Sequence, residues 1–211
     1  MRRILLLALL PLLLPLSAPA AEYELRPGLR IILPDLADPW LVAREPVPAM
    51  VEHLAEHLRD DAVRKGQAVT REQAKAAARK RLQANELMIY NQTSEAHLLI
   101  SFSPIDPGDA DPSARALAKS AQYAAEGVID EGWTKVKIRH ADARIQGAQR
   151  ARHFEIDYLE EGERGRFMGI VGYARPYWFW LYATDHLNDP GDREVLLRVL
   201  REIEVRSTPI P

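Results

Sequence analysis

The sequence contains no cysteine among its 211 residues. Disulfide bonds, thiol nucleophiles, cysteine-based zinc sites and lipidation on a cysteine are therefore excluded. The sequence also lacks a glycine-rich phosphate loop, a GxSxG nucleophile elbow and a recognisable Ser, His and Asp arrangement. It consequently predicts no cofactor and no catalytic residues.

An excess of charge of either sign is also missing. Lysine and arginine number 28, aspartate and glutamate 30, and the formal net charge is −2. Nucleic acids and anionic membranes attract strongly basic proteins. The near balance of charge therefore argues against both as partners.

Long apolar runs are limited to one, at the N-terminus. Arg2 and Arg3 precede the apolar segment Ile4–Leu16, and small residues follow from Ser17 to Ala21. This order predicts a secretory signal peptide over residues 1–21, with cleavage after Ala20 or Ala21. Because the run is shorter than the roughly 20 residues that span a bilayer, no integral membrane anchor is expected. We expect an exported protein of the periplasm.

Residues 22–211 are predicted to form a single α+β domain, in which helices pack on an antiparallel sheet. Alternation of polar and apolar residues from Thr134 onward predicts a C-terminal meander of strands. Residues 46–85 read as a helical insertion, because apolar residues there recur at helical spacing and Thr70 and Gln73 have the spacing of a capping box.

Further helices are predicted from their N-terminal signals. Asp111 is expected to cap a helix that begins at Pro112 and ends at Gly132, and Asp189 to cap one that begins at Pro190. After Ile203 the sequence predicts only a short polar tail.

One motif suggests a metal. His53, Glu56 and His57 match the HxxEH pattern of inverted zinc peptidases, in which two histidines bind zinc and the glutamate activates water. On a helical wheel the histidines flank the apolar stripe and Glu56 lies almost opposite it, as in an ordinary amphipathic helix. A zinc-dependent hydrolase remains an alternative.

A second set of polar residues alternates with apolar residues along one predicted strand. His153, Glu155 and Asp157 project to one face, where Lys135, Lys137 and Arg139 of a neighbouring strand could join them. An acid-base pair or a metal site is conceivable there, but cross-strand ion pairs on a solvated face explain the pattern more simply.

Aromatic residues gather in the last predicted strand. Alternation places Trp178, Trp180 and Tyr182 on one face and Phe179 and Leu181 on the other. If helices cover only one face, the first set marks a binding surface; if they cover both, it belongs to the core. Trp40, in a loop with several prolines, is a further candidate binding residue.

The order of elements resembles the PsbP-like fold of a photosystem II extrinsic subunit and of bacterial periplasmic DcrB-type proteins. The resemblance rests on Leu33-Pro34 with Trp40 beyond, and on the pattern from Phe154 through Tyr182-Ala183-Thr184 to Leu196, Leu200 and Ile203. The helix Thr70–Leu82 departs from the usual plan. The resemblance implies helices on an antiparallel sheet and a family whose members mostly bind other proteins.

The leading hypothesis is a non-enzymatic accessory module that binds another envelope protein through Trp178, Trp180 and Tyr182 or through Trp40. A more specific form is an immunity or inhibitor protein against a periplasmic enzyme. The zinc hydrolase competes with this hypothesis, as does a small-ligand carrier with a pocket between the sheet and the long helix predicted from Pro112 to Gly132.

Overall fold

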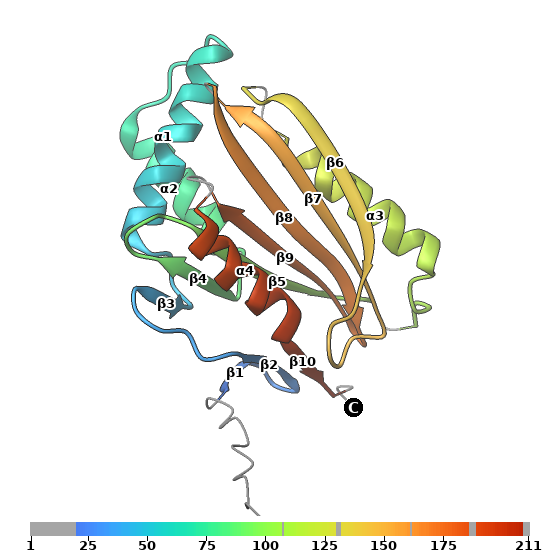
Figure 1. Ribbon diagram of the computed structural model, residues 1–211. Coiled ribbons are helices and arrows are strands. Elements are labelled where there is room, and N and C mark those ends of the chain that lie inside the picture. The colour runs from blue at the N-terminus through green and yellow to red at the C-terminus, as the bar shows by residue number, and fades with distance from the viewer. Residues whose placement is uncertain (1–19, 107, 130–131, 161, 186–188, 209–211) are drawn as a thin grey trace, which may run out of the picture.

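The computed structural model describes residues 20–106, 108–129, 132–160, 162–185 and 189–208, which form an α+β fold (Figure 1). The predicted fold class is thus confirmed. In chain order the elements are β1 (Ala21–Arg26), β2 (Leu29–Leu33), β3 (Trp40–Ala43), α1 (Pro48–Arg64), α2 (Arg71–Leu82), β4 (Leu87–Asn91), β5 (His97–Pro104), α3 (Ala114–Gly127), β6 (Thr134–Ala143), β7 (Arg150–Glu160), β8 (Glu163–Ala174), β9 (Tyr177–Asp185), α4 (Pro190–Glu202) and β10 (Glu204–Ser207).

Two antiparallel sheets organise the described residues. The larger has seven strands in the order β3-β4-β5-β9-β8-β7-β6, and the smaller has three in the order β1-β2-β10. Strands β6 to β9 pair with their neighbours in sequence, which confirms the predicted C-terminal meander. Strand β9 then pairs with β5, so the two halves of the chain share one sheet.

One face of the large sheet is closed by α4 and the small sheet. Leu98, Ile100 and Phe102 of β5 pair with Ala183, Leu181 and Phe179 of β9, and all are buried in the same apolar cluster as residues of α4, β2 and β10. Figure 1 shows α4 lying across this face, with β10 continuing from its end. This layer holds the largest part of the core.

The opposite face is covered in two places. Helices α1 and α2 pack over Met88 and Tyr90 of β4, whereas α3 packs over β7 and β8. Leu99 of β5 and Tyr182 of β9 are register partners, and each packs against one of these two helical groups. The strands β5 and β9 therefore lie between the two covered areas.

Local signals account for most helix ends. The Thr70 hydroxyl accepts from the Gln73 amide and the Gln73 side chain accepts from the Thr70 amide, which confirms the capping box. Asp189 caps α4 as expected, and Gly66 follows α1 with a φ of 67°.

Three predictions are wrong: the start and the end of the helix expected over residues 112–132, and the polar tail after Ile203. Ser113, not Asp111, caps α3, which runs only to Gly127; the Asp111 carboxylate instead accepts a hydrogen bond of 2.8 Å from the Tyr173 hydroxyl. The segment after Ile203 is not a polar tail, because β10 pairs with β2 and buries Val205.

The predicted signal peptide falls largely outside the described residues, which begin at residue 20. Among the described helices, none is long and apolar enough to cross a membrane.

Candidate functional site

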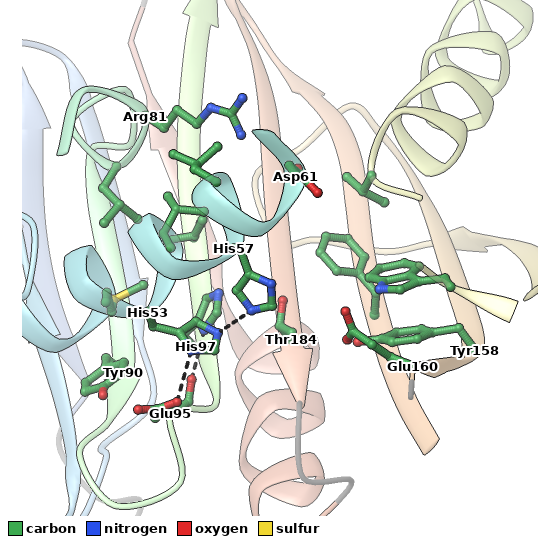
Figure 2. A pocket seen from close by; sticks show the side chains of 18 residues that line it. His53, His57, Asp61, Arg81, Tyr90, Glu95, His97, Tyr158, Glu160 and Thr184 are labelled. Carbon is green, nitrogen blue, oxygen red and sulfur yellow. Dashed lines mark hydrogen bonds and ion pairs between the residues drawn. The ribbon is translucent and has the colours of Figure 1, made fainter. Parts of the chain in front are cut away.

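A cleft of about 230 Å³ opens between α1 and the sheet (Figure 2). Its floor includes Leu99 of β5 and Thr184 of β9, which lie between the two helical groups. Apolar and aromatic side chains make up most of the lining, and a few polar groups converge on it. Clefts of this composition are typical of sites for small ligands.

One wall of the cleft carries a histidine pair. His53 and His57 lie one turn apart on α1, and their Nε2 atoms are 3.1 Å apart. The Glu95 carboxylate lies 3.3 Å from Nδ1 of His53. Since a hydrogen bond between two ring nitrogens needs one donor and one acceptor, the arrangement holds a single proton between the two Nε2 atoms.

A third histidine, His97, begins β5 beside this pair. Its Nδ1 lies 2.9 Å from the backbone carbonyl of Glu95, to which it donates. Burial lowers the pKa of His97 to about 4, and burial followed by repulsion from His57 also lowers the pKa of His53. Both rings are therefore neutral near pH 7.

The opposite wall is aromatic. Trp133 stacks on Tyr158 of β7 with ring centroids 3.6 Å apart and planes 7° apart. Gly165 of β8 makes this possible, because a Cβ there would lie 2.2 Å from the Tyr158 ring. Glu160 follows on the same strand, and Figure 2 shows its carboxylate directed toward the histidine side of the cleft.

The predicted metal motif is only partly assembled. His53 and His57 meet, but Glu56 is exposed and does not line the cleft. In the described part of the chain, no three or more His, Cys, Asp or Glu side chains are grouped so that they could hold a metal ion. The residues do not provide the water-activating glutamate that the zinc hydrolase hypothesis requires.

The aromatic residues of β9 lie on the same face as the cleft. Trp178, Trp180 and Tyr182 are each half-buried and pack against the cluster beneath α3. Trp178 and Trp180 stack with centroids 6.2 Å apart, and burial raises the pKa of Tyr182 to about 12. These three side chains combine core packing with partial exposure. Trp40, by contrast, retains only 9% exposure within the main core.

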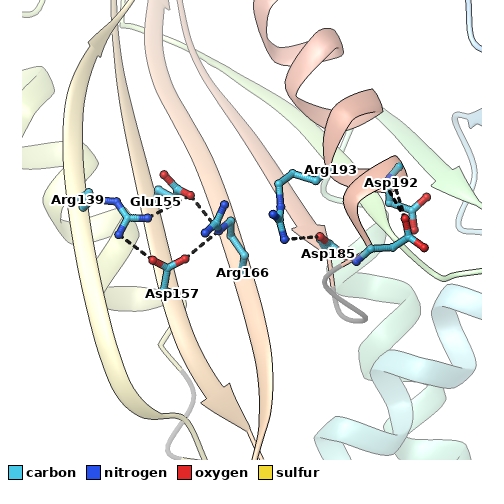
Figure 3. Close-up of polar contacts among 9 residues, drawn as sticks. Arg139, Glu155, Asp157, Arg166, Asp185, Asp192 and Arg193 are labelled. Atoms are coloured by element: carbon cyan, nitrogen blue, oxygen red, sulfur yellow. Dashed lines mark hydrogen bonds and ion pairs between the residues drawn. The ribbon is translucent and has the colours of Figure 1, made fainter.

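The polar strand face forms an ion-pair network (Figure 3). Arg139 lies 3.2 Å from Glu155 and 2.7 Å from Asp157, and Arg166 of β8 lies 2.9 Å and 2.8 Å from the same carboxylates. Cross-strand ion pairing on this face is confirmed for Arg139 with Glu155 and Asp157, and Arg166, which the sequence did not indicate, completes the network.

A buried polar group lies near the start of α4. Asp185 is fully buried 3.6 Å from Arg193, and burial raises its pKa. Asn91 donates to Asp192 at 2.7 Å, joining the end of β4 to α4. The two contacts connect β9 and β4 to α4, so these buried residues have a structural role.

Sequence reasoning does not find most residues of the cleft. It gives no role to Glu95, His97, Trp133, Tyr158 and Glu160. These residues lie in a turn or near strand ends, and their convergence depends on the pairing of β5 with β9.

Comparison with known proteins assigns no family. No protein-family model and no curated protein matches the chain. A solution structure of cyanobacterial PsbP from Synechocystis sp. PCC 6803 is similar at 10% identity and a TM-score of 0.45, over 94% of this chain and 98% of that one. A crystal structure of a Pseudomonas aeruginosa protein of unknown function is similar at 14% identity and a TM-score of 0.34, over 92% and 99%. These likenesses concern the fold alone, and neither identifies a function.

Proposed function

We propose that the protein is exported to the periplasm and acts there without catalysis, as an accessory module that binds a small ligand in the cleft between α1 and the sheet. The observation that carries the proposal is the cleft itself, a largely apolar cavity of about 230 Å³ with converging polar side chains. The N-terminal segment supports export, and cleavage after Ala20 would leave all of β1 in the mature chain.

Ligand binding is tested by thermal unfolding with three probes that share one carbon skeleton. These are 3-phenylpropylamine, 3-phenylpropanol and 3-phenylpropanoate. A ligand that binds only the folded state stabilises it by about 2.7 kcal/mol at one hundred times its Kd. We expect at least one probe to raise the Tm of the unmodified protein.

The control separates the cleft from the rest of the surface. Leu54→Trp places an indole in the cavity, whereas Arg59→Trp adds the same side chain to an exposed position of α1 outside it. Stabilisation by the probes should disappear in Leu54→Trp and persist in Arg59→Trp. Equal responses in the two variants would contradict a site in the cleft.

A second candidate function is docking of another envelope protein on Trp178, Trp180 and Tyr182. The partial exposure of three adjacent aromatic residues on one strand face favours it. Because these rings also pack on the core, Trp180→Tyr is a gentler test than truncation. Crosslinking in the native envelope should then yield a partner with the unmodified protein and less of it with the variant; equal yields would argue against docking there.

A further inference from the structure

We infer that the cleft takes an organic cation, a protonated amine carried on a small apolar or aromatic body. The inference rests on the proposed function and specifies the ligand class of the same site. It follows from the charges, the hydrogen-bond partners and the aromatic residues that surround the cavity.

The charged lining is predominantly acidic. Asp61, Glu95 and Glu160 line the cleft, and Arg81 is the lining residue with a permanent positive charge. Arg81 is exposed, and Figure 2 shows it at the edge away from the histidines. An anion inside the cleft would therefore meet more repulsion than attraction, while a cation would meet the reverse.

The three carboxylates differ in their interaction partners. Asp61 pairs with Arg64 of the same helix, and Glu95 lies against His53. Within the described residues, no ion pair or side-chain hydrogen bond reaches the carboxylate of Glu160, which is half-buried. A carboxylate at the edge of an apolar cavity gains most from a cationic partner, because water solvates it incompletely there.

Two of the histidines add no positive charge to the cleft. His53 and His97 are neutral near pH 7, since burial lowers both pKa values. Because these two rings are neutral, the wall opposite Glu160 does not repel a protonated amine.

The aromatic wall completes the match. Trp133 and Tyr158 line the cavity next to Glu160, and the Tyr158 ring is covered by Trp133 and Gly165. Cation–π attraction is therefore assigned to the indole face of Trp133 that does not stack on Tyr158. Leu54, Leu58 and Leu99 provide apolar contact for the rest of the ligand.

The test is isothermal titration calorimetry at pH 7.5 and low salt with the same three phenylpropyl probes. We expect 3-phenylpropylamine to bind about tenfold more tightly than 3-phenylpropanol or better, because it adds charge-assisted hydrogen bonds. We expect 3-phenylpropanoate to bind more weakly than the alcohol. Alcohol binding as tight as amine binding would overturn the inference.

A matched pair of variants tests the role of Glu160. Glu160 and Glu163 are register partners across the β7–β8 hairpin, but Glu163 is exposed and does not line the cleft. Glu160→Gln should weaken amine binding about tenfold and leave alcohol binding unchanged, whereas Glu163→Gln should leave both unchanged. Equal amine affinity in the two variants would show that the Glu160 carboxylate is not the counter-charge of the amine.

The two proposals can fail separately. If the alcohol or the carboxylate binds most tightly, and Leu54→Trp abolishes that binding, the cleft is a ligand site but does not prefer a cation. Absence of binding by all three probes at millimolar concentration would count against both.

Discussion

Replacing Gly147 with alanine should destabilise the protein by about 3 kcal/mol or more, because the new methyl group has no room. Gly147 has a φ of 83°, and a Cβ there would lie 1.7 Å from the backbone carbonyl oxygen of Val205. The neighbouring Gln146 carbonyl accepts a hydrogen bond from the Val205 amide at 2.9 Å, so the loop and β10 are held together. The clash is with backbone and cannot be relieved by rotating a side chain.

Gly66→Ala is the matched control for this substitution. Gly66 also has a positive φ, of 67°, but a Cβ there would have nothing within 4 Å. The substitution Gly66→Ala should lower the free energy of unfolding by about 1 to 2 kcal/mol, which is the penalty for a left-handed conformation alone. Chemical denaturation of both variants measures the difference. Equal losses of unfolding free energy would show that β10 does not pack against the Gly147 loop.

Acid should destabilise the protein through His97. Its pKa is about 4 in the folded state, compared with 6.5 as the ordinary value, so the unfolded chain takes up a proton first as the pH falls. The stability that His97 contributes is present above pH 6.5 and is lost as the pH falls toward 4. With one proton involved, the slope approaches about 1 kcal/mol per pH unit. Protonation of His53, whose pKa is also lowered, adds to the loss.

His97→Gln isolates this contribution. A glutamine amide can still donate to the Glu95 carbonyl, but it does not titrate. Urea unfolding between pH 6.5 and 4 should give the variant a slope shallower by about 1 kcal/mol per pH unit than that of the unmodified protein. Parallel stability curves would show that His97 is not the group that resists protonation.

The fold class and most elements could be predicted from local signals. The capping box at Thr70, the cap at Asp189 and the alternation in β7 act over a few residues, so the sequence displays them directly. The end of the chain could not be predicted in this way. Strand β10 is stabilised by pairing with β2, which lies far away in sequence, and its own four residues carry little signal.

The same limit applies to the candidate site. His53 and His57 are recognisable because they lie one turn apart on one helix, but their neighbour is Glu95 rather than Glu56. The cleft combines α1, the β4–β5 turn and the end of β7, and only the strand order of the large sheet brings these segments together. The aromatic set on β9 does share one face, as alternation predicts, yet its half-buried state depends on where α3 packs.

Native mass spectrometry of the protein purified from the periplasm of its own cells tests the central claim most directly. We expect a chain that begins at Ala21 or Glu22 and carries a noncovalent small-molecule adduct, which is lost on denaturation and absent in Leu54→Trp. A chain that carries no adduct, or the same adduct with Leu54→Trp in place, would contradict a ligand in the cleft. An uncleaved chain recovered only from the cytoplasm would contradict export.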